Sequence, residues 1–375
     1  MSPLSAILAS LLVANGAFAA PAVIARETPS GFDPNSYQKQ FVQCNAVERS
    51  GLTPQNITLK LGYLDINPTA KKTIVMVHGW PSLWTTYRNQ IEAFGSEYRL
   101  IIPENRGYGD SEHPKDLYSS NTMGDFVNDI ECMMDNAGVA SGVCMGNDFG
   151  AQVCWEAGLL SPNRFKGVFN VGVPFISSAR EFKTNEQFSQ VAPNLGYTFY
   201  LSNNATGASK EMDADPRSAI RACAQIAATV PPHDFLSSKT SFLEPWNEWE
   251  KENNVTTIPF SGIMSQEVED YMVESYQKQG FFNTYNGYQA NNRLETYLNQ
   301  KKLGKTSLSQ PAFVLFPTRD PVANWHDWSL QEESYKYLAN FYNATTPSAH
   351  WAHEELPEEF NLHFTQWIGN VTFDA

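Results

Sequence analysis

One acidic side chain in a turn of small residues has the clearest capacity for chemistry in this chain. Asp148 lies at the centre of Gly146-Asn147-Asp148-Phe149-Gly150, between a short apolar run and a helix-like run. The glycines allow the backbone to turn sharply, so the turn is expected to present the carboxylate at the carboxyl end of a strand, where such sheets bind ligands. The alternative is that Asp148 only caps the helix that follows.

Two later residues complete a possible catalytic set with Asp148. Asp320 and His350 each follow a predicted strand, so both are expected on the same edge of a sheet as Asp148. Taken singly, Asp320 could be a turn residue before Pro321, and His350 could be a packed surface histidine. The chain order of nucleophile, acid and histidine, together with the strand ends, favours the catalytic interpretation.

A carboxylate nucleophile implies a particular reaction. Asp148 would attack a saturated carbon and form an alkyl ester, which suits epoxides and alkyl halides. His350 would take a proton from the water that hydrolyses the ester, and Asp320 would orient the imidazole and stabilise its cation. The oxyanion would be held by the backbone N–H groups of Trp80 and Phe149. No cofactor is required, and no Cys or His spacing suggests zinc.

A parallel sheet is needed to bring these residues together. Short apolar runs predict strands at residues 57–63, 73–77, 100–103, 143–146, 165–173 and 311–316, with helices at 84–94, 122–136 and from about 150. Thr122, followed three residues later by Asp125, predicts a capping box. Strands that alternate with helices in this way are typical of an α/β fold with a parallel, right-handed, doubly wound sheet.

The alternation breaks in the middle of the chain. Residues 175–305 are rich in aromatic and acidic side chains, with helical pieces such as 265–279. We interpret this stretch as a helical lid inserted into a core of residues 21–174 and 306–375. Within the core, we expect an N-terminal arm at 20–55, a helix at 330–341, a weak strand before His350, and a final helix at 357–368.

Composition indicates the compartment and excludes some partners. A net charge of −14 over 375 residues disfavours nucleic acid and anionic membrane surfaces. Residues 1–20 have an apolar core and a small-x-small site at 17–19, which predicts a secretory signal. No later segment is long and apolar enough to span a membrane, so a secreted protein without stable membrane insertion is expected. Oligomeric state stays open.

Sequons and cysteines fit the same compartment. Five sequons follow the predicted signal and favour a glycosylated protein: Asn56, Asn204, Asn254, Asn343 and Asn370. The chain has five cysteines, and this odd number leaves at least one unpaired within the chain. Cys144, on the strand before Asp148, is expected to be a buried thiol; the disulfide pairing stays open.

Four segments together resemble the soluble epoxide hydrolase family of α/β-hydrolases. They are His78-Gly79-Trp80-Pro81, Arg106-Gly107-Tyr108-Gly109-Asp110-Ser111, the Gly-x-Asp-x-Gly-Ala turn at 146–151, and His350-Trp351. The resemblance extends from about residue 57 to 370. It implies the α/β-hydrolase fold with a helical lid, and hydrolysis of a small apolar epoxide to a vicinal diol without a cofactor.

The same resemblance implies that two lid tyrosines hydrogen-bond the epoxide oxygen. Residues 196–200 are similar to the first tyrosine motif of the family and favour Tyr197 over Tyr200. Residues 280–288 are similar to the second and favour Tyr288 over Tyr285. An alkoxide leaving group needs such a donor, although with 16 tyrosines in the chain both could be ordinary lid aromatics.

Three positions depart from the family pattern. Asn147 stands where the family usually has His, Phe149 where it has Trp, and Ala349 where it has Gly. Phe149 also disfavours the nearest alternative, a haloalkane dehalogenase, in which a Trp N–H at that position helps to hold the halide. A non-catalytic hydrolase-fold binding protein is disfavoured because Asp148, Asp320 and His350 are all present, and a serine esterase because the turn offers no hydroxyl.

Overall fold

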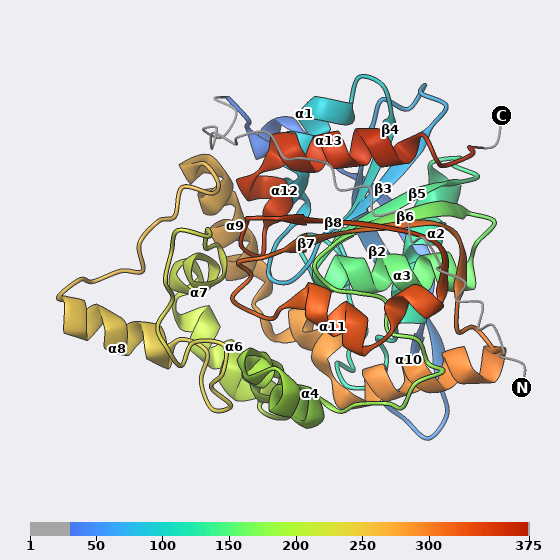
Figure 1. Ribbon diagram of the computed structural model, residues 1–375. Helices are drawn as coiled ribbons and strands as arrows, with labels where there is room; N and C mark the ends of the chain where they lie inside the picture. The colour runs from blue at the N-terminus through green and yellow to red at the C-terminus, as the bar shows by residue number, and fades with distance from the viewer. Residues whose placement is uncertain (1–30, 374–375) are drawn as a thin grey trace, which may run out of the picture.

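The centre of the sheet consists of strands that are buried on both faces. Every residue of β3 (Thr73–Val77) and β5 (Gly142–Asn147) is buried, as expected for parallel strands covered by helices on both sides. The computed structural model describes residues 31–373, and in this part of the chain the sheet has the order β1-β2-β4-β3-β5-β6-β7-β8 (Figure 1). Strands β3 to β8 are parallel, while β1 and β2 are antiparallel to their neighbours. The predicted mostly parallel, doubly wound sheet is confirmed.

Helices cover both faces of this sheet (Figure 1). The remaining strands are β1 (Gln40–Glu48), β2 (Gln55–Ile66), β4 (Arg99–Pro103), β6 (Phe165–Val171), β7 (Leu308–Pro317) and β8 (Leu338–Thr346). The core helices are α1 (Arg88–Phe94), α2 (Met123–Asn136), α3 (Phe149–Leu160), α11 (Trp325–Gln331), α12 (Ala352–Glu355) and α13 (Pro357–Ile368). Along β3, Val75 and Val77 pack into the core that contains α2 and α3, while Ile74 and Met76 face the core that contains α1 and α13.

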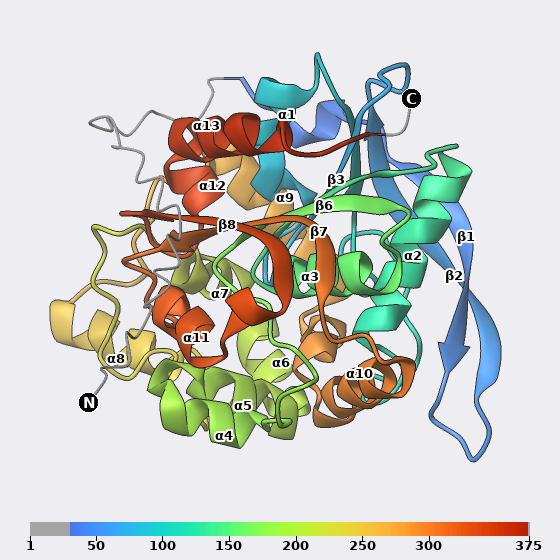
Figure 2. The same cartoon turned by 45° about the vertical axis from the view of Figure 1, so that its right-hand side comes forward.

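Between β6 and β7 the chain forms helices and no strand. These helices are α4 (Asn185–Val191), α5 (Gly196–Asn203), α6 (Ala205–Ala214), α7 (Pro216–Cys223), α8 (Glu244–Asn253), α9 (Gln266–Gln279) and α10 (Ala290–Leu303). Figures 1 and 2 show them grouped along one side of the sheet. The predicted helical lid inserted into the sheet fold is confirmed, as is the capping box of Thr122 and Asp125 on α2.

Two predictions at the ends of the core are wrong. Residues 40–48 are not an arm over the domain but strand β1, which pairs with β2 at one edge of the sheet. Residues 330–341 are not one helix, because the helix there is α11 (Trp325–Gln331) and β8 begins at Leu338. Both strands lie at sheet edges and leave many side chains exposed. They therefore lack the continuous apolar run that marks a central strand.

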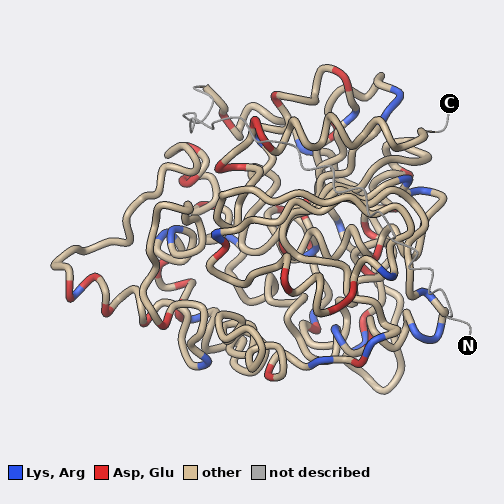
Figure 3. The backbone as a smooth tube through the Cα atoms, in the orientation of Figure 1, with Lys and Arg blue, Asp and Glu red and all other residues tan. Residues whose placement is uncertain are grey.

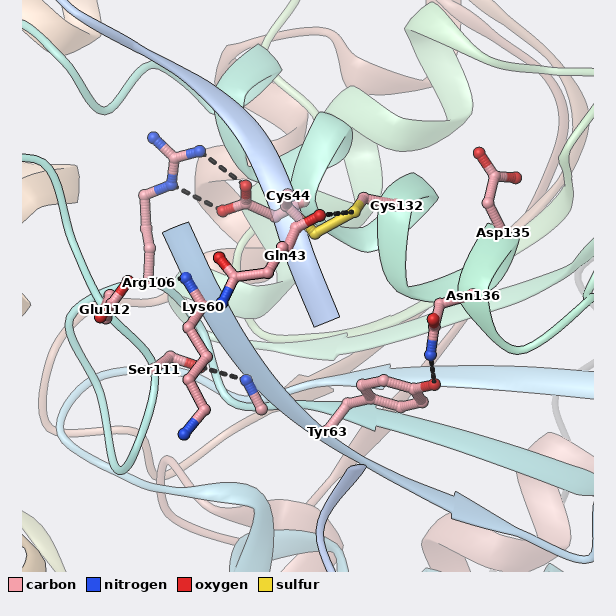
Figure 4. Close-up of a disulfide and its surroundings, with 12 residues drawn as sticks. Gln43, Cys44, Lys60, Tyr63, Arg106, Ser111, Glu112, Cys132, Asp135 and Asn136 are labelled. Atoms are coloured by element: carbon pink, nitrogen blue, oxygen red, sulfur yellow. Dashed lines mark hydrogen bonds and ion pairs between the residues drawn. A yellow bond between two sulfur atoms is a disulfide. The ribbon is translucent and has the colours of Figure 1, made fainter. Parts of the chain in front are cut away.

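Two disulfides connect strands to helices. Cys44–Cys132 joins β1 to α2 (Figure 4), where the Tyr63 hydroxyl also accepts a hydrogen bond from Asn136 at 2.8 Å. Cys144–Cys154 joins β5 to α3. The expectation of a buried thiol at Cys144 is therefore wrong, because the turn after β5 folds α3 back against the strand and brings Cys154 within bonding distance. Cys223 remains as a free thiol in the described part of the chain.

Several predictions concern the surface or the N-terminus. All five sequon asparagines are exposed, which leaves glycosylation a prediction that the fold permits. The predicted signal at residues 1–20 lies outside the described residues. Within residues 31–373 no helix is long and apolar enough to cross a membrane. Acidic and basic positions are interspersed along the chain (Figure 3).

Candidate active site

Asp148 occupies a strained turn that two glycines make possible. Its φ of 54° and ψ of −120° lie in a region that non-glycine residues rarely adopt, at a cost of about 1–3 kcal/mol. A Cβ on Gly150 would lie 1.9 Å from the Val77 carbonyl oxygen, and one on Gly146 would lie 2.4 Å from the Gly150 carbonyl oxygen. Only glycine at both positions lets α3 begin so close to β3 and β5.

The structure brings the three predicted catalytic side chains together. His350 Nδ1 lies 2.6 Å from Asp320 Oδ2, and His350 Nε2 lies 3.3 Å from Asp148 Oδ2. The Asp320 carboxylate also accepts hydrogen bonds from the Val322 backbone N–H at 2.8 Å and from the Trp325 indole N–H at 2.6 Å. Asp320 is thus fixed from three directions, so it can hold the imidazole in one orientation.

The two oxygens of the Asp148 carboxylate have different surroundings. Oδ1 accepts a hydrogen bond from the Trp80 backbone N–H at 2.9 Å, whereas Oδ2 faces His350. A Cβ on Gly79 would lie 2.7 Å from the Asp148 Cβ, so glycine is required before Trp80 for this approach. Phe149 is the first residue of α3, and its backbone N–H has no acceptor within the helix. The geometry therefore supports Oδ1 as the oxygen that becomes the oxyanion.

The two carboxylates control the charge of His350. Burial alone would lower the pKa of the imidazole, but Asp320 and Asp148 outweigh burial and raise the pKa to about 10. At neutral pH the resting site therefore holds an imidazolium ion between two carboxylates. Any process that removes the charge of Asp148 also removes part of the stabilisation of that cation.

Two lid tyrosines lie above this group. Tyr197 is on α5 and Tyr288 ends the 3₁₀ turn Phe282–Tyr288, and the Trp80 ring contacts both. Burial, with a further contribution from the negative charge of Asp148, raises the pKa of each phenol well above its usual value, so both are protonated donors. Each of the two hydroxyls influences the pKa of the other. The Tyr288 hydroxyl is buried and makes no hydrogen bond of good geometry within residues 31–373.

The competing tyrosines of each motif have other neighbours. The Tyr285 hydroxyl contacts the Met212 sulfur at 3.2 Å. Burial, with a smaller contribution from Glu211, raises the pKa of Tyr200. Among the four tyrosines, Tyr197 and Tyr288 are therefore the pair whose pKa values respond to the charge of Asp148.

The turn that carries Tyr288 is docked on the core by residues of the sequence motifs. The Trp80 indole N–H donates to Thr284 Oγ1 at 3.1 Å, and the Tyr108 hydroxyl donates to the Thr284 carbonyl at 3.0 Å. Asn286 donates to the Arg106 carbonyl at 3.1 Å. The segment that begins with Arg106 thus serves to position the lid, a role that the sequence motif alone did not indicate.

Sequence reasoning missed two further contributors. Asn147 Nδ2 donates to the backbone carbonyl of His350 at 3.2 Å, and Trp325 holds Asp320 as described above. Asn147 was visible only as a departure from the family pattern. No sequence pattern indicated a role for Trp325, because the helix of this region was expected at residues 330–341 and α11 instead begins at Trp325.

A narrow apolar pocket adjoins the catalytic group. It is lined by Pro81, Met264, Met272 and Trp351, among other residues. Pro81 directly follows Trp80, whose backbone N–H donates to Asp148 Oδ1, and Trp351 directly follows His350. The polar groups at this pocket include the carboxylate of Glu354 and the hydroxyl of Thr85.

Comparisons with known proteins identify the family of the chain. A model of the alpha/beta hydrolase fold family matches residues 72–357. Epoxide hydrolase A of Mycobacterium tuberculosis is 24% identical over 315 residues, which cover 83% of this chain and 94% of that protein. An epoxide hydrolase of Caballeronia sordidicola is 28% identical over 272 residues, which cover 70% of this chain and 77% of that protein.

Solved structures show the same fold. Epoxide hydrolase A from Mycobacterium thermoresistibile superposes with a TM-score of 0.69 at 21% identity, over 89% of this chain and 100% of that one. An epoxide hydrolase from an endophytic Streptomyces gives a TM-score of 0.68 at 18% identity, over 88% and 95%. The chain therefore belongs to the alpha/beta hydrolase fold family, and it is an epoxide hydrolase-like member of that family.

Proposed function

We propose that this protein is an epoxide hydrolase that converts an apolar epoxide and water into a vicinal diol through an alkyl ester of Asp148. The observation that carries the proposal is the position of the Asp148 carboxylate. Its Oδ2 faces His350 at 3.3 Å, and its charge influences the phenols of Tyr197 and Tyr288. The names of the relatives support the same activity.

In the first step, Asp148 Oδ2 attacks a carbon of the epoxide ring. The ring C–O bond breaks, and the leaving oxygen takes a proton from Tyr197 or Tyr288. An unassisted alkoxide is a poor leaving group, so the two buried donors lower the barrier of this step. Because the ester is neutral, His350 loses one of the two charges that raise its pKa. The imidazolium can then release the proton that restores the tyrosine.

In the second step, neutral His350 takes a proton from water and the resulting hydroxide attacks Asp148 Cγ. Oδ1 becomes the oxyanion, held by the N–H groups of Trp80 and Phe149. The bond between Cγ and Oδ2 then breaks, and the proton of the new carboxyl group passes to the departing alkoxide. The diol leaves with Oδ2, and Asp148 regains an oxygen from water.

The substrate class follows from the walls of the site. Apolar side chains dominate the pocket beside Trp80 and Trp351, so an apolar substituent of the epoxide is stabilised there by loss of water contact. Alkyl halides are the second candidate substrates, because the ester chemistry is the same. The Phe149 ring has no N–H for a halide, and two phenols suit an alkoxide, so epoxides are favoured. A protein that only binds a ligand would not need His350 placed between the carboxylates of Asp148 and Asp320.

We also propose that the protein is secreted and glycosylated. The apolar start of the chain, the five exposed sequons and the two disulfides support this compartment. The test is expression of the full chain in a eukaryotic secretory host. Cleavage after residue 19 or 20 and a mass decrease on glycosidase treatment are expected, whereas retention of an uncleaved, unglycosylated chain would contradict the proposal.

Activity itself is tested with styrene oxide and a matched pair of variants. The wild type is expected to release phenylethanediol, and Asp148→Ala is expected to abolish turnover while the protein stays folded. Asp327→Asn, on α11 but exposed to solvent, is the control and should retain activity. Halide release from an alkyl halide without diol formation would favour the dehalogenase instead.

A further inference from the structure

A second pocket lies away from the catalytic group. It has a volume of about 160 Å³, and its walls include residues of α3, α4, α10 and the chain segment at residues 176–183. Figures 1 and 2 show α4 and α10 on the side of the sheet that α3 covers. Its apolar walls include Ile176, Phe182, Phe188 and Tyr297, and none of the proposed catalytic residues lines it.

Arg293 supplies the positive charge of this pocket. Its guanidinium lies 4.9 Å from the centre of the Phe188 ring and 5.6 Å from that of Phe182. It donates one hydrogen bond to Asn185 Oδ1 and one to the Lys183 carbonyl, the latter at 3.0 Å. A guanidinium has five N–H donors, so three are left for another partner.

No carboxylate within residues 31–373 neutralises Arg293. The other charged groups that line the pocket are Lys183, Glu332 and Glu181. Lys183 pairs with Glu332, which also pairs with Arg180 at 2.9 Å, and Glu181 is exposed. Burial lowers the pKa of Arg293 to about 10, which is the direction expected for a cation that lacks a nearby anion.

We propose that this pocket is a binding site for a small carboxylate with an aromatic or apolar body. The remaining N–H groups of Arg293 suit the two oxygens of a carboxylate, which arginine binds in a bidentate manner. The body of the ligand packs against the faces and edges of three aromatic rings, those of Phe182, Phe188 and Tyr297. The site differs from the proposed catalytic site, although Asn185 connects the two by donating to the Tyr288 carbonyl at 2.7 Å.

Isothermal titration calorimetry of the full-length protein with 4-phenylbutyrate and its neutral amide tests this site. The wild type is expected to bind the acid at least about tenfold more tightly than the amide, because only the acid forms charge-assisted hydrogen bonds. Arg293→Gln should remove this preference. Arg164→Gln, which alters an arginine that pairs with Asp135 elsewhere, should keep it.

Equal binding of acid and amide by the wild type would overturn the proposal, and so would undiminished binding of the acid by Arg293→Gln. The acid–amide comparison needs no variant, so it decides the question even where Arg293→Gln fails to fold. Phe188→Ala provides a second variant: it should weaken acid and amide alike, because it removes a wall for the shared body of the ligand.

Discussion

The side-chain amide of Asn147 donates a hydrogen bond to the backbone carbonyl of His350 at 3.2 Å. The residue before the proposed nucleophile thus holds the loop that carries the proposed base, although the two positions lie 203 residues apart. Asn147 is buried, and its Oδ1 has no hydrogen-bond partner within the described residues. We therefore assign Asn147 the role of positioning His350 relative to Asp148.

Replacing Asn147 with Ala should lower the rate of ester hydrolysis more than the rate of ester formation. A lost hydrogen bond of about 0.5–1.5 kcal/mol corresponds to a roughly two- to tenfold decrease in kcat. Pre-steady-state kinetics separates the two steps. Asn170→Ala is the control, because Asn170 is also a buried strand asparagine and donates to the Ala151 carbonyl instead. An equal effect of both variants on kcat would contradict the positioning role.

The pKa of His350 should depend on the charge of Asp148. In the wild type, NMR titration of the imidazole is expected to give a pKa of about 10, and Asp148→Ala should move it downward. Because the folded pKa is raised above the ordinary 6.5, His350 stabilises the fold fully below pH 6.5, and this contribution is lost as the pH rises through about 10. An unchanged pKa in Asp148→Ala would contradict this coupling.

Removing either lid hydroxyl should slow the opening of the epoxide. In single-turnover measurements, Tyr197→Phe and Tyr288→Phe are each expected to reduce the rate of ester formation by about tenfold or more, with a smaller effect on hydrolysis. Tyr285→Phe is the matched control, since its hydroxyl contacts Met212. If only the hydrolytic step slows, the tyrosines do not have the proposed role.

The disulfide Cys144–Cys154 encloses the turn of Asp148. Replacing both cysteines with Ala should lower the free energy of unfolding by about 2–4 kcal/mol, measured in urea. Cys223→Ala, which alters the free thiol, should have a smaller effect. Mass mapping of an unreduced digest checks the bond directly, and alkylation of Cys144 without prior reduction would contradict it.

The central strands and the positions of the site residues could be predicted because of one physical regularity. Parallel strands buried on both faces are continuous apolar runs, and their carboxyl ends meet at one edge of the sheet. Asp148 and Asp320 each follow such a run, at β5 and β7. Their proximity to His350 in space follows from this, while their roles in catalysis stay predictions.

The weak strand predicted before His350 is confirmed as β8, although it begins earlier than expected, at Leu338. The edge strand β1 and the bonds between distant segments could not be predicted. Strand β1 exposes one face and β8 exposes side chains on both faces, so their sequences resemble those of loops or amphipathic helices. The bond from Asn147 to His350 depends on the exact path of two loops, and so does that from Trp325 to Asp320. No local pattern encodes such contacts, because they arise only once the sheet has formed.

The alkyl ester of Asp148 is the central claim, and isotope transfer tests it most directly. Excess enzyme is incubated with styrene oxide in oxygen-18 water for a single turnover. The diol should carry unlabelled oxygen from Asp148 Oδ2, and the label should appear in the Asp148 carboxylate, as found by mass spectrometry of the peptide that contains it. Labelled diol in that first turnover, with an unlabelled Asp148, would mean that water attacks the epoxide directly and would contradict the account.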